Sequence, residues 1–195
     1  MKEVYLIRHG ATLENKARLL VGLSDPPLDE DERVLLESVK VSINPDVIFS
    51  SPLRRASSTA KLLFPGREII YDSNLVERSF GELEGTHIEI IGVDEKGNNI
   101  YSHRDEATII SKGGESLIDL ESRITGFLKR LGEINDKLIV VVSHGTLISH
   151  MVRILLKEEK PRSSPRNLNV VHFFLDNDGT VSKLSYDKTL NQFIK

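Results

Sequence analysis

Two short runs of apolar residues constrain most strongly how this chain can fold. They cover residues 4–7 and residues 138–142, and neither run alternates with polar residues. Strands of this kind are typical of the centre of a parallel sheet, where helices cover both faces. We therefore expect these two strands to lie at the centre of the sheet of an α/β protein.

Helical patterns separate these runs from further strand-like segments. The longest helical pattern covers residues 115–134, where apolar residues recur at spacings of three and four. The C-terminal stretch "NVVHFFLDNDGTVSKLSYD" has the pattern of two strands joined at Asp178-Gly179. Alternating strands and helices predict an α/β fold, here a three-layer α/β/α sandwich with a mostly parallel central sheet and an antiparallel edge. Further strands are expected at residues 47–50 and 68–71, and further helices at residues 28–42 and 54–64 and directly after the strand at 138–142.

The composition is that of an ordinary globular protein. With 195 residues the chain fits one domain, and it contains 39% hydrophobic and 28% charged residues. A net charge of -3 gives no general attraction to nucleic acid or to anionic membranes, so we expect neither as a partner. The lack of cysteine excludes disulfides, thiolate nucleophiles and zinc–cysteine sites. The apolar run near the N-terminus is too short for a signal peptide and no stretch approaches a membrane span, so we expect a cytoplasmic location.

Both central strands end in a histidine followed by a glycine. "LIRHG" places Arg8 and His9 at the end of the first strand, and "VVSHG" places His144 at the end of the other. Ligands of open α/β sheets bind at the carboxyl ends of the strands, so the two histidines meet if the strands are neighbours. A single histidine after a strand is more often a hydrogen-bonded structural residue than a catalyst. Two such pairs at two central strand ends favour a functional site.

Two further segments place charged residues at the same edge. "SSPLRRASSTA" begins a helix with Arg54 and Arg55, where the helix dipole disfavours cations unless an anion binds nearby. "LVERSFGELEG" adds Glu77, a carboxylate placed to exchange a proton with a ligand. The alternative for each is a solvated loop residue. A metal site is disfavoured because the histidines lack HExxH or HxH spacing and arginines would repel a cation, and no GxxxxGK[ST] or GxGxxG loop occurs.

Five motifs occur together in an order that is typical of one superfamily. "LIRHGATLEN", "SSPLRRASSTA", "LVERSFGELEG", "GGES" and "VVSHG" resemble the histidine phosphatase superfamily, which includes cofactor-dependent phosphoglycerate mutases and many small phosphatases. The resemblance implies that His9 is the phosphorylated nucleophile and that Glu77 is the proton donor. It also implies a set of phosphate contacts, with a clamp and two further donors: Arg8, Arg55 and His144, then Asn15 and the Gly145 amide.

This resemblance implies a phosphomonoesterase that works through a phosphohistidine and needs neither a metal nor an organic cofactor. His9 has to be neutral to attack phosphorus, while the two arginines and a protonated His144 would hold the phosphoryl oxygens. The partner is then a small phosphorylated substrate, and the oligomeric state stays open. Two alternatives remain: phosphoglycerate mutase-type phosphoryl transfer, and a non-catalytic protein that binds phosphorylated ligands. Hydrolysis is favoured over transfer because mutases of this family are typically longer than this chain.

Residues 86–112 differ in character from the rest of the chain, which we treat as one domain over residues 1–195. They are charged, contain the turn-forming "KGNN" and lack a sustained period. Long excursions of this kind are often lids or binding loops, so we expect this segment to cover the site in part and to select the substrate. Its basic residues, His103 and Arg104 among them, suit a second anionic group, and its apolar residues, such as Ile88, suit an apolar one. The alternative is that the apolar residues simply pack onto the domain.

Overall fold

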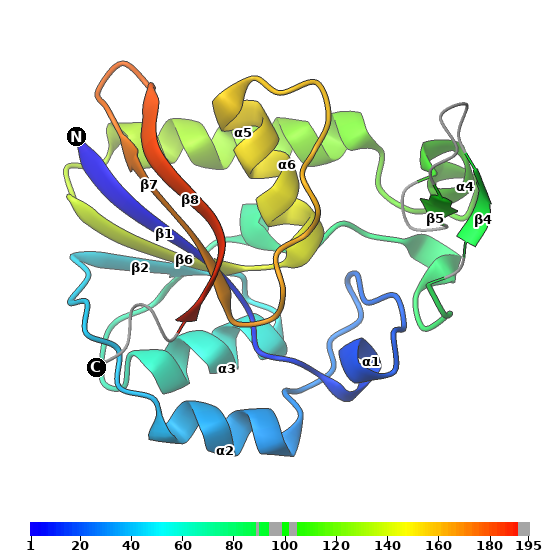
Figure 1. The fold of residues 1–195 in the computed structure, drawn as a ribbon, viewed down its shortest axis with the longest axis horizontal. Coiled ribbons are helices and arrows are strands. Elements are labelled where there is room, and N and C mark those ends of the chain that lie inside the picture. Colours follow the sequence, from blue (N-terminus) through cyan, green and yellow to red (C-terminus); the bar gives the residue numbers. More distant parts are fainter. Residues whose placement is uncertain (89, 94–98, 102–104, 191–195) are drawn as a thin grey trace.

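A mixed β-sheet forms the middle layer of the protein (Figure 1). The computed structural model describes residues 1–88, 90–93, 99–101 and 105–190. Within these residues the sheet has six strands, in the order β3 (Ile70–Tyr71), β2 (Val47–Ser50), β6 (Leu138–Ser143), β1 (Lys2–Arg8), β7 (Asn169–Leu175) and β8 (Val181–Thr189). The first four strands of this order run parallel, whereas β7 is antiparallel to β1 and β8 is antiparallel to β7.

The two strands expected at the centre of the sheet occupy its middle positions. β1 and β6 pair in parallel register from Glu3 opposite Leu138 to Arg8 opposite Ser143. The pairing continues one residue further, because the backbone N–H of His9 donates to the Ser143 carbonyl oxygen at 2.9 Å. The expectation from two uninterrupted apolar runs is confirmed, and it fixes the ends of both strands next to each other.

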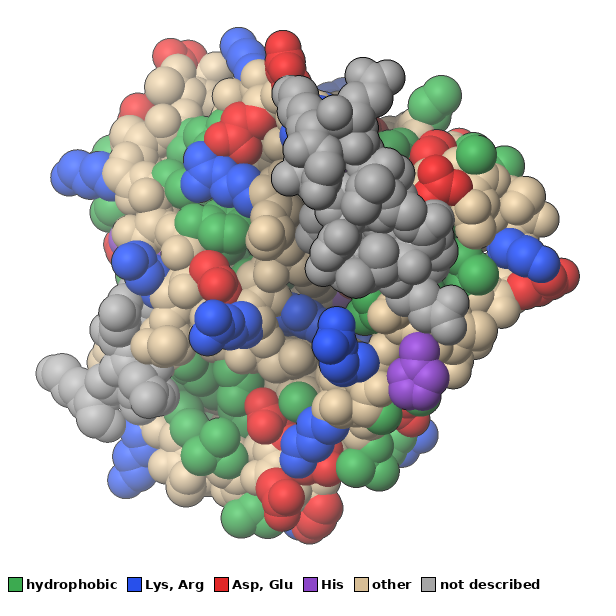
Figure 2. All heavy atoms as spheres, turned by 45° about the vertical axis from the view of Figure 1, so that its right-hand side comes forward, with side chains coloured by type: hydrophobic (Ala, Val, Ile, Leu, Met, Phe, Trp, Pro, Cys, Tyr) green, Lys and Arg blue, Asp and Glu red, His purple; other side chains and the backbone are tan. Residues whose placement is uncertain are grey.

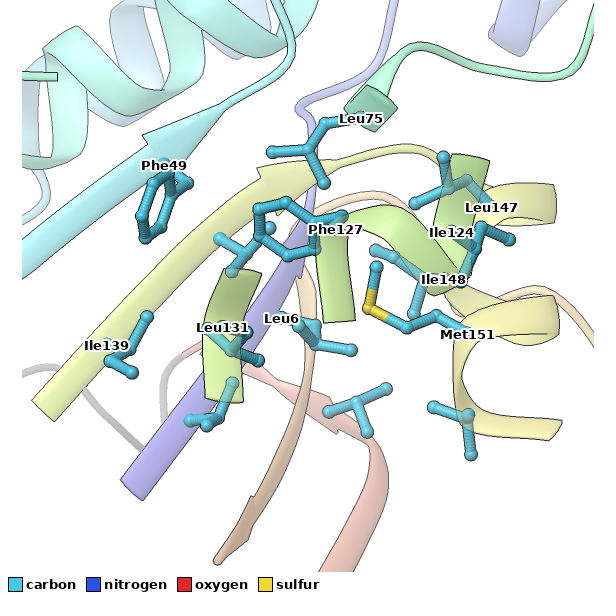
Figure 3. Close-up of a cluster of buried hydrophobic side chains, with 14 of the residues drawn as sticks. Leu6, Phe49, Leu75, Ile124, Phe127, Leu131, Ile139, Leu147, Ile148 and Met151 are labelled. Atoms are coloured by element: carbon cyan, nitrogen blue, oxygen red, sulfur yellow. The ribbon is translucent and has the colours of Figure 1, made fainter. Parts of the chain in front are cut away.

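Helices cover both faces of the sheet. Alternate side chains of β1 contribute to two separate cores: Leu6 is buried with Phe127 on one face (Figure 3), whereas Ile7 is buried on the other. The fold is therefore a three-layer α/β/α sandwich with a mostly parallel sheet and an antiparallel edge, as the sequence predicts. The helices of the two outer layers (Figure 1) are α5 (Leu117–Glu133) and α6 (Gly145–Leu156) on the first face, and α2 (Glu30–Ser38) and α3 (Arg54–Leu63) on the second.

The element bounds differ from the sequence expectations at a few ends. β7 and β8 form the expected hairpin around the Asp178-Gly179 turn. The helix expected over residues 28–42 is shorter, because it begins after Asp29, whose side chain caps its first turn. The strand expected over residues 68–71 is also shorter, because it pairs with β2 only at its last two residues.

Residues 86–112, expected to be irregular, contain short regular elements. Among the described residues these are β4 (Ile90–Val93) and β5 (Asn99–Tyr101), which pair antiparallel, and α4 (Glu106–Ser111). Figure 1 shows them beyond the end of the sheet, on the side where α1 lies, and the segments that lead there are α1 (Leu13–Lys16) and two 3-10 turns, η1 (Ser73–Leu75) and η2 (Gly81–Leu83). No helix among the described residues combines the length and the apolar composition that crossing a bilayer requires.

Candidate active site

The carboxyl edge of the sheet gathers the residues that the sequence singled out. Arg8 ends β1 and His9 follows it. His144 follows β6 and precedes α6, and Arg55 lies in the first turn of α3, which follows β2. The rings of His9 and His144 lie 5.0 Å apart between their centroids, and both side chains are almost completely buried. Parallel strands thus bring side chains from distant parts of the sequence into contact.

The hydrogen bonds of His9 fix which of its ring nitrogens keeps a lone pair. Nδ1 lies 2.6 Å from the Gly10 carbonyl oxygen. Because a carbonyl oxygen only accepts hydrogen bonds, Nδ1 carries the proton and Nε2 is the unprotonated nitrogen. Nε2 accepts a hydrogen bond from Nε of Arg55 at 3.3 Å. The lone pair of a neutral imidazole therefore faces a guanidinium group.

Burial and positive neighbours favour the neutral forms of both histidines. Burial lowers the pKa of His9 well below its usual value, and the Arg55 and Arg8 guanidinium groups lower it further. Burial and the nearby Arg55 also hold the pKa of His144 well below its usual value. A protonated His144 is expected only when it holds a phosphoryl group, and without one this environment disfavours its charged form. Nε2 of His144 lies 2.8 Å from Ser51 Oγ, whereas Nδ1 is buried without a hydrogen-bond partner among the described residues.

The loop before α2 holds the fully buried Arg55 side chain. Nη1 and Nη2 donate to the carbonyl oxygens of Ser24 and Gly22, each at 2.8 Å. Glu84 fixes this loop, because its carboxylate accepts two of the loop's backbone N–H groups at 2.9 and 2.7 Å. Position 22 requires glycine, since a Cβ there would lie 2.6 Å from the backbone carbonyl oxygen of Arg78 and would also collide with the Glu84 carboxylate. Carbonyl oxygens, and behind them a carboxylate, thus hold the buried cation in place.

Arg8 has one satisfied and one unsatisfied donor group. Nη1 donates to the Pro165 carbonyl oxygen at 2.7 Å. Nε is buried and has no hydrogen-bond partner among the residues that the structure describes. A buried donor without a partner is destabilising, and an oxygen of a bound anion would satisfy it.

Glu77 links the segment after η1 to the start of α6. Its Oε2 accepts from the Thr146 N–H at 3.0 Å, and its Oε1 accepts from the N–H groups of Leu147 and Arg78 at 3.1 and 2.9 Å. Helices leave the N–H groups of their first turn unpaired, and the N-cap residue His144 makes no side-chain capping bond here. Glu77 therefore caps α6 from outside the helix, which fixes its carboxylate at the same edge as the histidines.

Two asparagines connect α1 to the end of β1. Oδ1 of Asn15 accepts from the Thr12 N–H at 3.2 Å and from Nδ2 of Asn167 at 3.3 Å. These bonds orient the Asn15 amide so that its NH₂ group is left to donate to a ligand. Nδ2 of Asn167 also donates to the His9 carbonyl oxygen at 3.0 Å. Asn167 therefore holds both the Asn15 amide and the backbone of His9.

A cavity of about 140 Å³ lies beside these groups. His9, Arg55 and His144 are buried and are not among its lining residues, so a ligand in the cavity would meet Arg8, Asn15 and Glu77 first. Figure 2 turns towards the reader the side on which α1 and α4 lie, where basic and hydrophobic side chains are interspersed near the middle of the face. The lining residues are Arg8, Asn15, Leu19, Leu20, Val21, Glu77, Phe80, Ile88, Gly145, Thr146 and Ser164.

A larger hollow of about 640 Å³ lies elsewhere, at the amino ends of β2 and β6. Its lining includes Asp46 and Lys137, which directly precede those strands, so it opens at the opposite edge of the sheet from the histidines. Among the described residues, no three His, Asp or Glu side chains lie close enough together to hold a metal ion. The cavity at the carboxyl edge is therefore the candidate site.

Sequence reasoning missed two residues of this site, Asn167 and Ser164, and proposed two that the structure does not test. Asn167 and Ser164 lie in the connection between α6 and β7, which belongs to no motif. The hairpin signal was the available clue, because β7 pairs antiparallel with β1 and so begins beside the end of β1. His103 and Arg104 lie outside the described residues, so their part in specificity stays a prediction.

Sequence comparison identifies relatives across most of the chain. The sequence profile of the "Histidine phosphatase superfamily (branch 1)" matches residues 4–192. The chain is 31% identical over 164 residues to "Probable phosphoglycerate mutase GpmB" of Salmonella paratyphi A. The aligned region covers 80% of this chain and 75% of that protein.

Structure comparison agrees. A phosphoserine phosphatase from Entamoeba histolytica, solved in complex with 3-phosphoglyceric acid, superposes with a TM-score of 0.74 at 27% identity and covers 95% of each chain. A phosphoglycerate mutase from Bacillus anthracis shares the fold with a TM-score of 0.77 at 21% identity, covering 96% of this chain and 93% of that one. Together with the profile match, which extends over nearly the whole sequence, these similarities show that the chain belongs to the histidine phosphatase superfamily.

Proposed function

We propose that this protein hydrolyses phosphate monoesters through a phosphohistidine on His9, with Glu77 as general acid and then general base. The observation that carries the proposal is the tautomer of His9, whose Nε2 lone pair is unprotonated, buried and adjacent to a guanidinium group. A neutral imidazole nitrogen is the nucleophile that forms a phosphohistidine. The relatives support the class of reaction, since they include proteins named as phosphatases and as phosphoglycerate mutases.

The two steps use the same groups in opposite protonation states. In the first, Nε2 of His9 bonds to phosphorus, the bond from phosphorus to the ester oxygen breaks, and the Glu77 carboxyl gives its proton to the departing oxygen. In the second, the Glu77 carboxylate takes a proton from water, the water oxygen bonds to phosphorus and the N–P bond breaks. Inorganic phosphate leaves, and His9 and Glu77 return to their starting forms.

Arg8 and Arg55 supply the positive charge that a phosphoryl group requires. Guanidinium groups present paired donors that match phosphoryl oxygens, and the unpartnered Nε of Arg8 is one such donor. Burial and the positive charges of Arg55 and Arg8 lower the pKa of His144. A phosphate dianion would reverse that balance and favour the protonated form, in which Nδ1 becomes a further donor.

The test is the fate of the phosphoryl group in His9→Ala. Rapid quenching of the unaltered protein with radiolabelled phenyl phosphate should show one acid-labile phosphate on His9 and release of inorganic phosphate without added metal. His9→Ala should lose the label and at least about 10³-fold in turnover. His172→Ala, a half-buried histidine in the middle of β7, is the matched control and should keep both.

Each competing activity gives a different result in the same assay. Normal turnover by His9→Ala would reject the nucleophile. Isomerised phosphoglycerate in place of inorganic phosphate would identify a mutase. Absence of both label and turnover on all esters in the unaltered protein would leave phospho-ligand binding as the function.

A further inference from the structure

The cavity beside the phosphate-binding residues has two chemically different sides. One side is polar and consists of Arg8, Asn15, Glu77, Gly145, Thr146 and Ser164. The other side is apolar and comes from two separate segments, the chain after α1 and the chain around η2: Leu19, Leu20, Val21, Phe80 and Ile88. A phosphoryl group on the polar side would place the remainder of its ester against the apolar side.

Backbone hydrogen bonds build this apolar wall before any ligand arrives. The Leu20 N–H donates to the Thr86 carbonyl oxygen at 2.8 Å, and the Ile88 N–H donates to the Arg18 carbonyl oxygen at 3.0 Å. Leu20 and Phe80 are buried in a small core of their own, against which Ile88 packs. The wall is therefore a fixed surface, and its exposed part needs no rearrangement to contact a ligand.

The described part of the lining offers one cation, and no second cationic partner for a further anionic group. Of the described lining residues, Arg8 is the one cation, and it is needed for the phosphoryl group. A carboxylate on the ester's organic part would lie against apolar side chains and near Glu77. A buried carboxylate without a partner is strongly disfavoured, whereas an apolar group gains from leaving water.

We propose that this wall binds an uncharged apolar group, so that the substrate is the phosphate monoester of an apolar or aromatic alcohol. This inference rests on the proposed phosphatase function, whose substrate class it names. On this proposal the described lining favours such esters over phosphorylated hydroxy acids. It also assigns Leu19, Val21 and Ile88 to substrate selection, because they are the half-exposed members of the wall.

Binding of two phosphonates that differ only in their organic part tests the inference without depending on turnover. Benzylphosphonate and 3-phosphonopropionate share the phosphonate group, and calorimetry gives the Kd of each for the full chain. We expect benzylphosphonate to bind about tenfold more tightly. Equal affinity, tighter binding of the carboxylated compound, or no binding of either would overturn the proposal.

Two wall variants with matched controls show where the discrimination arises. Ile88→Ala should weaken benzylphosphonate binding by about fivefold and leave 3-phosphonopropionate nearly unchanged, while Ile69→Ala, another half-buried isoleucine outside the lining, should change neither. Val21→Lys should shift the preference towards 3-phosphonopropionate by about tenfold, and Val181→Lys on β8 should not. Unchanged preference in both wall variants would overturn the assignment of these residues.

Turnover of phenyl phosphate is measured in parallel and addresses the proposed function alone. Preferential benzylphosphonate binding without hydrolysis of any ester would reject the phosphatase and keep the apolar subsite. Hydrolysis with a preference for carboxylated esters would keep the phosphatase function and reject the apolar subsite.

Discussion

Glu77 has a structural task and, in the proposed mechanism, a chemical one. Its carboxylate accepts three backbone N–H groups, two of them from the first turn of α6. The same carboxylate lines the cavity and is the proposed acid and base. Because the helix cap fixes its position, Glu77 acting as the proposed acid would deliver its proton from one defined direction.

Replacing Glu77 by glutamine removes the acid and keeps the size of the side chain. For Glu77→Gln we expect kcat/KM on alkyl phosphates to fall by about 10²-fold or more, because their leaving oxygen needs a proton. Formation of phosphohistidine from nitrophenyl phosphate should fall much less, since nitrophenolate leaves without protonation. Steady-state kinetics on both esters, with rapid quenching for the first step, measures the difference.

Asp46→Asn provides the control for Glu77→Gln. Asp46 also accepts two backbone N–H groups, at 2.9 and 2.8 Å, but at the opposite edge of the sheet. Asp46→Asn should change neither kcat/KM on alkyl phosphates nor the rate of phosphohistidine formation from nitrophenyl phosphate. An equal loss on both esters in Glu77→Gln, with phosphohistidine formation unimpaired, would remove the acid role and leave only the activation of water.

The sequence predicted the residues of the site that lie in short contiguous motifs. His9 and His144 could be placed because each ends a strand whose apolar run is visible in the sequence. Asn167 could not, because its contacts with His9 and Asn15 exist only once β7 has paired with β1. The lowered pKa of His144 in the ligand-free protein could not be predicted for a related reason: the burial that lowers it is a property of the packed cluster.

Gly145, the first residue of α6, lines the cavity. A Cβ at Gly145 would lie 3.1 Å from Ser164 Cβ and 3.2 Å from Arg8 Cζ. A methyl group at Gly145 would therefore require the Arg8 guanidinium group or Ser164 to shift by a few tenths of an ångström. The glycine at the start of the helix allows this close approach of Arg8.

Gly145→Ala should therefore displace Arg8 and leave the fold intact. We expect KM for phosphate esters and the inhibition constant of vanadate each to rise by about tenfold, because both ligands rely on the phosphate contacts. Gly126→Ala in α5 is the control, since a Cβ there meets nothing within 4 Å. It should leave KM unchanged and raise the free energy of unfolding by about 1 kcal/mol. Equal KM values in both variants would show that Arg8 tolerates the methyl group.

Element boundaries were less predictable than the elements themselves. The apolar pattern predicted the N-terminus of α5 to within two residues. Ser116 caps this helix directly before Leu117, its first apolar residue. β3 was overestimated, because strand length depends on the partner, and β2 pairs with it only at Phe49 and Ser50. The β4–β5 pair was not predicted, because its sequence lacks the alternation of a half-buried strand.

For the whole molecule, the buried histidines make stability depend on pH. The pKa values of His9, His144 and His150 are all lowered by burial in the folded protein. Below about pH 6.5 the unfolded chain binds protons at these histidines and the folded chain does not, so protons favour unfolding.

The free energy of unfolding should thus decrease as the pH falls from 7 to 5. Each fully neutral histidine contributes up to about 1.4 kcal/mol per pH unit to this slope, and urea denaturation at several pH values measures it. His9→Asn removes one of these histidines, so the free energy of unfolding should change less steeply with pH, by the contribution of one proton. Stability that stays constant or increases over this range would contradict the burial of neutral histidines.

The position of β1 in the sheet also determines when the site can exist during synthesis of the chain. Both neighbours of β1 are made late, since β6 begins at Leu138 and β7 at Asn169. At ribosomal rates the apolar β1 waits on the order of ten seconds for its first partner. During that time His9 and Arg8 have no opposing strand, and the nascent chain cannot bind phosphate. An exposed, unpaired apolar strand is also prone to aggregate, and the arrangement that assembles the site leaves β1 in that condition until β6 emerges.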